Sequence, residues 1–150
     1  MKINDQEYLF KTKLLGEHNI TNIMLGIALA LELNIDIDKI VKNVSEIKQI
    51  EHRLEVKKIN GLTFIDDAFN SNPVGSKKAV DVLSMMNKNR YIVTPGMIDL
   101  GSRQEEINKE YGSYMANKVD YVILVGEIQT KPILEGLKEA NLNMDNCSVY

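Results

Sequence analysis

The sequence of 150 residues contains a single cysteine, Cys147, and no tryptophan. One cysteine excludes an intrachain disulfide and any metal cluster built on several thiolates, which agrees with a reducing compartment. Basic residues are not in excess, because 18 lysines and arginines face 21 aspartates and glutamates and give a formal net charge of −3. Binding to polymeric nucleic acid is therefore disfavoured, since no basic surplus is available to neutralise its phosphates.

Long apolar runs are also missing. No stretch reaches the roughly 18 consecutive apolar residues of a membrane-spanning helix, and residues 1–22 lack the apolar core of a signal peptide. The three prolines and nine glycines form no linker, and no repeat or low-complexity segment occurs. We therefore expect a cytoplasmic globular protein, long enough to build a core without disulfides or metals.

The first part of the sequence, residues 1–52, has the apolar spacing of helices. Apolar residues recur at helical spacing over 20–31 and again over 37–47. This spacing predicts a pair of helices, the first of them buried. Either Asp36 or Asp38 can cap the start of the second helix with its carboxylate.

From residue 53 onward the pattern changes to strands and helices in turn. Charged and apolar residues alternate, and Asn60-Gly61 then precedes the apolar run 62–65, which is typical of a β-hairpin with its preferred turn. Pro73 suits the first position of a helix. Further strands are expected at 91–94, 121–125 and 147–150, with helices between them. This order predicts an α/β fold with a mostly parallel sheet and flanking helices.

Polar residues gather directly after the expected strands. Asp66 and Asp67 follow the expected strand 62–65, the loop 95–103 follows the strand 91–94, and a Gly-Glu pair follows the strand 121–125. Because ligands of parallel sheets bind outside the carboxyl ends of the strands, we expect these residues to share one edge. Carboxylates there can accept hydrogen bonds from ribose hydroxyls or an ammonium group, and Arg103 can pair bidentately with a substrate carboxylate.

Local structure offers another explanation for several of these residues. Asp, Asn, Ser and Gly populate strand-to-helix turns without any ligand. Ser102 and Glu105 have the spacing of a helix capping box, and Asn19 alone is explained as a helix cap. His52 and Arg53 either form a solvated pair or direct a guanidinium across a cleft between domains. Neither a G-x-x-x-x-G-K-[ST] phosphate loop nor a G-x-G-x-x-G fingerprint occurs.

Four segments, in order along the chain, resemble the Mur ligase family of ATP-dependent enzymes, which form amide bonds in bacterial cell-wall precursors. Gly16 to Asn22 (GEHNITN) is similar to the family's G-x-H-N-x-x-N segment, and His52 to Glu55 is similar to its R-x-E segment. Asp66 to Pro73 (DDAFNSNP) is similar to the D-D-x-x-N-x-N-P turn. Together with Thr94 to Gly101, this turn most resembles the branch that joins D-alanyl-D-alanine to a UDP-N-acetylmuramoyl-tripeptide.

The resemblance implies roles for the matching positions. Asn19 and Asn22 are implied near the adenine and ribose of ATP, and Arg53, the implied catalytic residue, near its phosphates. Asp67 is implied to hold the ribose, and Asn70 to line the adenine side. The implied substrate-binding residues, for the incoming amino acid or dipeptide, are Asp66, Asn72, Gly96 and Arg103. No metal ligand is assigned to this chain.

The resemblance also implies a fold and a reaction. Residues 53–150 are expected to form a Rossmann-like C-terminal domain, apparently truncated at its end, and residues 1–52 to be the last helices of a central ATPase domain. The expected enzyme uses ATP and Mg²⁺ to activate the carboxylate of a UDP-N-acetylmuramoyl-peptide as an acyl phosphate, which an amine then attacks. Because the phosphate loop is absent from this chain, we expect the N-terminal and central domains to be missing and the chain alone to be inactive.

Two other functions stay open at this point. The chain can be a stand-alone module that keeps the fold only to bind a ligand or a protein partner. It can also belong to a related ligase with another substrate, such as a folate, a polyamide or a different wall precursor. The first alternative differs from the ligase reading in whether the native product carries an upstream ATPase segment.

Overall fold

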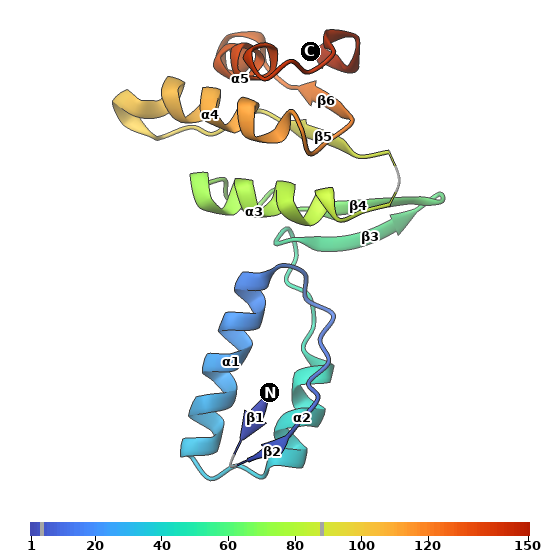
Figure 1. The fold of residues 1–150 in the computed structure, drawn as a ribbon, viewed down its shortest axis with the longest axis vertical. Helices are drawn as coiled ribbons and strands as arrows, with labels where there is room; N and C mark the ends of the chain where they lie inside the picture. The colour runs from blue at the N-terminus through green and yellow to red at the C-terminus, as the bar shows by residue number, and fades with distance from the viewer. Residues whose placement is uncertain (4, 88) are drawn as a thin grey trace. The chain divides into compact units, whose positions relative to one another are not determined.

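The computed structural model describes residues 1–3, 5–87 and 89–150, and the chain divides into two compact units, residues 1–67 and 68–150. Figure 1 shows the elements in chain order, from blue to red. The division follows Asp67, later than the change of sequence pattern at Arg53. In the part of the chain that is described, no helix is both long and apolar enough to cross a membrane.

The first unit consists of helices and two antiparallel strand pairs. Its elements are β1 (Lys2–Ile3), β2 (Gln6–Glu7), α1 (Glu17–Glu32), α2 (Ile37–Glu46), β3 (Glu55–Ile59) and β4 (Leu62–Asp66). Asp36 caps α2, because its Oδ1 accepts hydrogen bonds from the amides of Asp38 and Lys39 at 3.0 and 3.3 Å. Of the two capping candidates, the structure thus selects Asp36.

The α1 helix is less buried than its apolar sequence predicts. Only Ile27 of α1 is buried, and it packs with Ile40 and Val44 of α2 in a small core. Leu25 and Leu29 of the same helix are 67% and 63% exposed. The prediction of a buried helix is therefore wrong for this chain, because apolar residues surround much of α1 while the described chain covers one stripe.

The hairpin of β3 and β4 turns as its sequence predicts. Ile59 pairs with Leu62, and the two residues between them, Asn60 and Gly61, have positive φ angles of 50° and 80°. These are the backbone angles of the tight turn that Asn-Gly favours. Among the described strands, however, β4 pairs with β3 alone, so the expectation that it lies in the parallel sheet is wrong.

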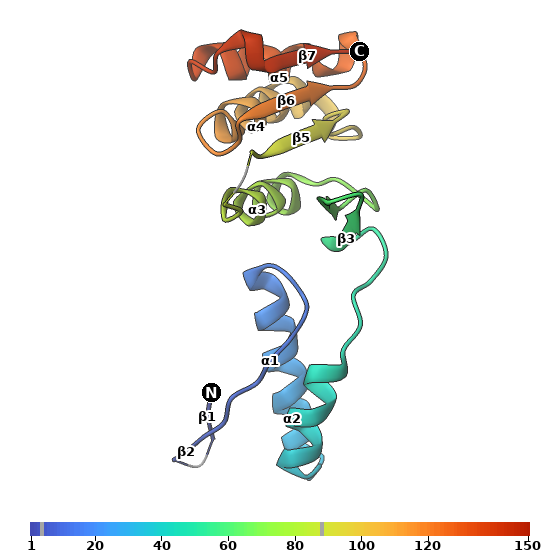
Figure 2. The same ribbon diagram turned by 90° about the vertical axis from the view of Figure 1, so that its right-hand side faces the viewer.

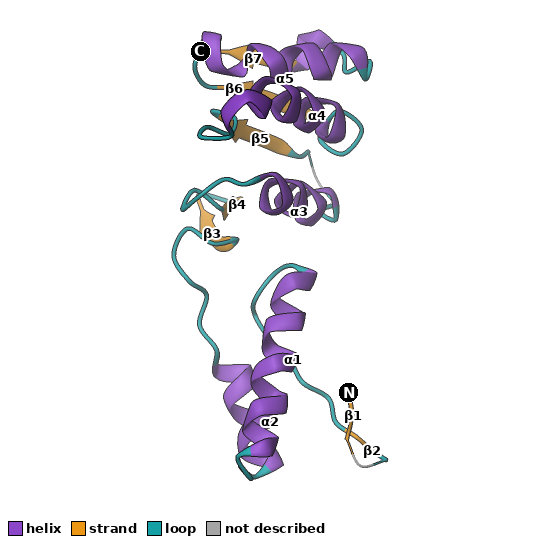
Figure 3. Cartoon of the chain, turned by 90° about the vertical axis from the view of Figure 1, so that its left-hand side faces the viewer, coloured by secondary structure: helices purple, strands orange, loops and turns teal. Residues whose placement is uncertain are grey.

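The second unit is an α/β layer. Its elements are α3 (Pro73–Ser84), β5 (Tyr91–Thr94), η1 (Gly101–Arg103), α4 (Gln104–Met115), β6 (Tyr121–Leu124), α5 (Glu127–Glu139), η2 (Met144–Asn146) and β7 (Cys147–Val149). The strands form one parallel sheet in the order β5-β6-β7. Figure 2 shows α4 and α5 behind this sheet, and Figure 3 shows them in front of it from the opposite side. The predicted α/β fold with flanking helices is confirmed.

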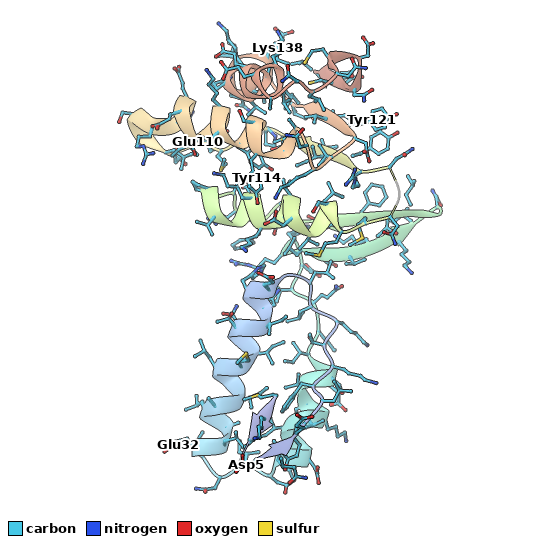
Figure 4. The ribbon with its side chains drawn as sticks, viewed as in Figure 1. Asp5, Glu32, Glu110, Tyr114, Tyr121 and Lys138 are labelled. Carbon is cyan, nitrogen blue, oxygen red and sulfur yellow. The ribbon has the colours of Figure 1, made fainter. Side chains whose placement is uncertain are left out.

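The core of this unit lies between the sheet and its helices. Val122 and Leu124 of β6 are fully buried and pack with Ile133 and Leu137 of α5 in a cluster that also includes residues of α3 and α4. The hydroxyl of Tyr114, labelled in Figure 4, donates a hydrogen bond to Asp81 of α3 at 2.6 Å. The sheet, α4 and α5 therefore share one core, and α3 is joined to α4 by a polar contact as well.

Candidate functional site

A short loop before β3 carries Arg53 in a constrained backbone conformation. Its neighbours His52 and Leu54 have positive φ angles of 58° and 49°. Residues other than glycine adopt this left-handed conformation at a cost of about 1–2 kcal/mol, so the surrounding structure must hold it. Strain of this kind is concentrated at functional sites, which makes the loop 51–54 a candidate for one.

Every backbone amide of residues 52–54 donates a hydrogen bond. The His52 amide donates to Glu55 Oε2 at 3.1 Å, and the Arg53 amide to the carbonyl of Ile50 at 3.2 Å. The Leu54 amide donates to Asp67 Oδ1 at 3.1 Å. Two of the three acceptors are thus carboxylates, which hydrogen-bond more strongly than neutral acceptors.

The hairpin side chains form a charged network beside this loop. Lys57 Nζ lies 3.0 Å from Glu55 Oε2 and 2.7 Å from Asp66 Oδ2, and His52 Nδ1 lies 2.9 Å from the same oxygen of Asp66. The hydrogen bonds to Asp66 and then Glu55 raise the pKa of Lys57. The contacts with Lys57 and then the His52 amide lower the pKa of Glu55. The network therefore favours the charged forms of Glu55 and Lys57.

The ligand atoms of His52, Glu55 and Asp66 lie within 4.8 Å of one another, which is close enough for three ligands of a metal ion. Lys57, however, already contacts both carboxylates of this group. A divalent cation bound there would have to displace the ammonium group. The arrangement is thus that of an ion-pair network with its positive charge supplied by the chain.

Asp67 lies directly after β4 and is the carboxylate that binds the backbone beside Arg53. Its pKa is raised because the carboxyl is partly buried, while the Leu54 amide, His18 and Arg53 each act to lower it. Its Oδ1 accepts from Leu54, and in the described part of the chain its Oδ2 accepts no hydrogen bond. The free oxygen can accept a hydrogen bond from a sugar hydroxyl. The structure also brings Arg53 and His18 into electrostatic range of this carboxylate.

The start of α1 contributes the remaining candidates of the first unit. Gly16, with a positive φ of 90°, occupies the cap position, and Asn19 lies inside the helix with its side-chain amide donating to the carbonyl of Leu15 at 2.7 Å. The explanation of Asn19 as the helix cap is therefore wrong. Its carbonyl oxygen is not used in that bond, and Asn22, one turn later, is exposed.

The candidates of the second unit lie in two loops. Asn72 caps α3 by accepting from the Gly75 amide at 2.8 Å, and Asn70 is exposed in the loop before it. Gly96 has a positive φ of 81°, and a Cβ there would lie 2.9 Å from Asn108 Oδ1. Arg103 is exposed and pairs with Glu106 at 3.0 Å. Local structure therefore occupies Asn72 and Arg103 and explains Gly96, whereas Asn70 stays available.

The expected capping box of α4 does not form. Gly101 to Arg103 make a 3₁₀ turn, so the helix begins at Gln104 and its cap residue, Arg103, makes no side-chain cap hydrogen bond. The prediction for Ser102 and Glu105 is wrong because this extra turn places Ser102 before the cap position. Ser102 is exposed.

Asn108 was missed from the sequence, although it organises the loop after β5. It is 1% exposed; its Oδ1 accepts from the Met97 amide at 2.9 Å, and its amide donates to the carbonyls of Met97 and Gln104 at 2.8 and 3.0 Å. The available signal was an asparagine at helical spacing from the apolar residues Tyr111 and Met115. A buried amide on such a stripe needs hydrogen-bond partners, and the adjacent loop supplies them.

Comparisons with known proteins show which proteins this chain resembles. A family model described as "Mur ligase, glutamate ligase domain" matches residues 52–149. UDP-N-acetylmuramoyl-tripeptide–D-alanyl-D-alanine ligase of Bacillus subtilis is 31% identical over 126 residues, which are 81% of this chain and 28% of that protein. UDP-N-acetylmuramoylalanine–D-glutamate ligase of Thermoanaerobacter sp. is 33% identical over 117 residues, 77% of this chain and 24% of that protein.

Solved structures of MurF proteins have a fold similar to that of this chain. A crystal structure of MurF from Acinetobacter baumannii superposes with a TM-score of 0.81 and 27% identity, covering 93% of this chain and 30% of that chain. MurF from Thermotoga maritima, solved in complex with ADP, has the same fold with a TM-score of 0.78 at 18% identity, covering 97% of this chain and 32% of that chain. The chain thus spans less than a third of the relatives it matches.

Proposed function

The chain belongs to the Mur ligase family, and we propose that it is the C-terminal part of an ATP-dependent ligase of peptidoglycan-precursor synthesis. The observation that carries the proposal is that Asp67 accepts a hydrogen bond from the Leu54 amide, next to Arg53, and lies within electrostatic range of the Arg53 side chain. The relatives named above are ligases of cell-wall precursors. We further propose that residues 1–52 belong to the end of a central ATPase domain and residues 53–150 to the C-terminal domain.

For the reaction, we propose that D-alanyl-D-alanine is joined to a UDP-N-acetylmuramoyl-tripeptide. The Bacillus subtilis relative and the Acinetobacter baumannii structures support this choice. ATP supplies the activation, because an unactivated carboxylate does not react with an amine: the γ-phosphoryl group converts the carboxylate to an acyl phosphate with release of ADP, and the attacking amine then displaces inorganic phosphate. Such nucleotide-linked substrates are handled in the cytoplasm, and we propose that location, with no nucleic-acid or membrane partner.

On the nucleotide side, Arg53 is proposed to place its guanidinium against the phosphates, where it neutralises charge that develops on phosphoryl oxygens. Asp67 is proposed to hold a ribose hydroxyl through Oδ2, the oxygen that Leu54 leaves free. Asn19 and Asn22 are proposed near adenine and ribose, and Asn70 on the adenine side. Most of the phosphate and Mg²⁺ contacts are proposed to come from the central domain, because this chain has no phosphate loop.

On the acceptor side, Arg103 is the residue whose chemistry suits the carboxylate of an incoming dipeptide. It now pairs with Glu106 through Nε in an exposed position, and such pairs exchange easily with another carboxylate. Gly96, held next to the buried Asn108, keeps the loop after β5 close to the helix layer. Asp66 and Asn72 remain proposed members of this side, although each already accepts hydrogen bonds from its own neighbourhood.

A second reaction is favoured by a specific observation, because the D-glutamate ligase of Thermoanaerobacter sp. reaches 33% identity over a similar length. The test is a ligation assay with the full-length product of this gene. ATP, Mg²⁺ and UDP-N-acetylmuramoyl-tripeptide are combined with D-alanyl-D-alanine, and in parallel UDP-N-acetylmuramoylalanine is combined with D-glutamate. Phosphate release and product mass are followed in both.

We expect ATP-dependent product with D-alanyl-D-alanine only. Product with D-glutamate alone would replace the proposed substrate and keep the ligase. No ligation in either reaction, with the chain still folded, would favour a stand-alone binding module. By itself the chain of 150 residues is proposed to be inactive in both assays, since it supplies one wall of the nucleotide site.

A further inference from the structure

We propose that His52 is a positioning residue, which holds the loop 51–54 in the conformation that presents Arg53. Glu55, Lys57 and Asp66 are the groups that hold His52 in turn. The inference rests on the proposed function in one respect, the role of Arg53 at the nucleotide. The arrangement of the loop itself is independent of that role.

The first argument is the backbone strain on both sides of Arg53. His52 and Leu54 both adopt the left-handed conformation, and neither is a glycine. Two such residues together cost about 2–4 kcal/mol, so without compensating bonds the loop would relax to other conformations. A relaxed loop would no longer fix the direction of the residue between them.

The second argument is that His52 is held at two points. Its amide donates to Glu55 at 3.1 Å, and its ring nitrogen Nδ1 lies 2.9 Å from Asp66. An ionised carboxylate only accepts hydrogen bonds, so Nδ1 carries the proton in this arrangement. The two bonds connect the loop to β3 and β4, the rigid part of the hairpin, and fix both the backbone and the ring of His52.

The third argument concerns the charges that face the ring. Asp66 contacts Nδ1, Glu55 contacts the amide of the same residue, and Lys57 lies between the two carboxylates at 2.7 and 3.0 Å. Lys57 offsets the repulsion of the two acids and occupies the position in which a cation would otherwise bind. Both carboxylates thereby make contacts within the hairpin, which gives Asp66 a positioning role in addition to the substrate contact proposed for it.

The fourth argument is the link from this loop to Asp67. Leu54, 4% exposed, donates its amide to Asp67 and so ties the far end of the loop to the proposed ribose-binding carboxylate. The backbone is therefore held on both sides of Arg53, at His52 by the ion-pair network and at Leu54 by Asp67. The same short segment therefore fixes the positions of both the Arg53 guanidinium and the Asp67 carboxylate.

The test compares two substitutions of His52 in the full-length ligase. The side-chain amide of asparagine can replace Nδ1 as a donor to Asp66, and asparagine tolerates the left-handed conformation, whereas alanine does neither. We expect His52→Ala to lower kcat/KM for ATP by about tenfold, which corresponds to the loss of one hydrogen bond to a charged group. The kcat/KM of His52→Asn should stay within about twofold of that of the unaltered enzyme. Lys109→Ala, which breaks an exposed pair with Glu139 in the second unit, is the matched control and should leave kcat/KM unchanged.

A double substitution separates positioning from general damage. If His52 acts through Arg53, His52→Ala should cause no further loss of kcat/KM in a protein that already carries Arg53→Ala. Independent, multiplying losses would overturn the proposal. Equal losses from His52→Ala and His52→Asn would overturn it as well, because the donor to Asp66 would then be irrelevant.

Amide hydrogen exchange tests the loop without the reaction. We expect exchange of the amides of residues 52–54 to accelerate about tenfold in His52→Ala and to remain unchanged in His52→Asn. Unchanged exchange in His52→Ala overturns the positioning role whatever the enzyme does. Accelerated exchange in a protein whose unaltered form ligates neither substrate pair would contradict the proposed function and leave the assignment of His52 to the loop supported.

Discussion

Arg53 and Asp67 are the residues on which the proposed chemistry depends most. Their side chains influence one another, and Asp67 also binds the backbone next to Arg53. In the full-length ligase we expect Arg53→Ala to lower kcat/KM for ATP by about 10- to 100-fold, the range expected for a hydrogen bond to a charged group. Asp67→Asn, which keeps an acceptor oxygen, should have a smaller effect than Asp67→Ala. Steady-state kinetics with varied ATP measure these losses.

The control for these substitutions lies in the same unit of the chain. Lys42, exposed on α2 and 3.9 Å from Glu46, is changed to alanine and should leave kcat/KM unaltered. Circular dichroism verifies that each variant is folded. Kinetics of folded Arg53→Ala that match the unaltered enzyme would remove Arg53 from the nucleotide site.

Asp120 is the residue with the clearest pH-dependent contribution to stability. Arg90 donates from its side chain to both oxygens, at 3.0 and 2.8 Å, and from its amide at 2.8 Å, which lowers the pKa of Asp120 to about 2. Because this pKa is about 3.9 in an unfolded chain, the pair stabilises the fold above pH 4 and the contribution disappears as the pH falls through about 2.

We expect Asp120→Asn to lower the free energy of unfolding at pH 7 by about 1 kcal/mol, a value reduced for the partial exposure of the pair. The same variant should lose less stability than the unaltered chain between about pH 4 and pH 2. Urea denaturation at a series of pH values measures both effects. Parallel pH profiles for the two proteins would contradict the assignment.

The close packing of α4 against α5 depends on two glycines. A Cβ at Gly112 would overlap the carbonyl oxygen of Ile133, and one at Gly136 would overlap the carbonyl oxygen of Lys109. We expect Gly136→Ala to lower the free energy of unfolding by about 2 kcal/mol, although alanine is the better helix former, because backbone atoms on the facing helix must move. Urea denaturation of the chain gives the value.

Gly26 in α1 is the matched control, because among the described residues no atom outside the adjoining backbone of α1 lies within 4 Å of a Cβ built there. Gly26→Ala should be neutral or stabilise the chain by up to about 1 kcal/mol through helix propensity alone. Similar changes in the free energy of unfolding for Gly26→Ala and Gly136→Ala would show that α4 and α5 can move apart at no cost in stability. The comparison therefore tests packing and not the helix preference of glycine.

Local sequence rules predicted several turns and helix starts correctly where neighbouring residues alone determine the backbone conformation. The Asn60-Gly61 turn, the capping of α2 by one of the two candidate aspartates and Pro73 at the first position of α3 are all confirmed. Each depends on backbone geometry within about four residues, which the sequence contains directly. The final strand at Cys147 is confirmed for a similar reason, since a short apolar run after a helix continues the alternation of the fold.

Two of the predictions that failed, for α1 and β4, required knowledge of distant partners, whereas the caps expected at Asn19 and Ser102 failed locally because α1 begins at Glu17 and α4 at Gln104. The apolar spacing of α1 shows that the helix has apolar faces, but not which of them the chain covers, and Leu25 and Leu29 are exposed. In the same way, β4 looks like any other strand until its only described partner is seen to be β3. The site behaves likewise: Asp67 and Arg53 stand out by type, whereas the role of His52 depends on Asp66, a residue on the far strand of the hairpin.

At the scale of the whole chain, each proposed set of site residues draws on both units. The nucleotide set comprises Asn19, Asn22, Arg53 and Asp67 of the first unit and Asn70 of the second, and the acceptor set comprises Asp66 of the first unit and Asn72, Gly96 and Arg103 of the second. A ligase must bring nucleotide, carboxylate and amine to one point, because acyl transfer requires aligned reactants and exclusion of water. Both units thus contribute candidates to the one proposed reaction.

The affinity of the 150-residue chain for ATP follows from the groups it offers. An affinity near 1 µM corresponds to about −8.2 kcal/mol. The proposed contacts of Arg53 and Asp67 supply roughly 3–4 kcal/mol and those of Asn19, Asn22 and Asn70 about 1 kcal/mol each, and the loss of translational freedom is subtracted from that sum. We therefore expect calorimetric titration of the chain with ATP and Mg²⁺ to show no micromolar binding, and the full-length ligase to bind under the same conditions. Micromolar binding by the chain alone would mean that the phosphates are held by residues within these 150, and would contradict the proposal that a central domain supplies the phosphate loop.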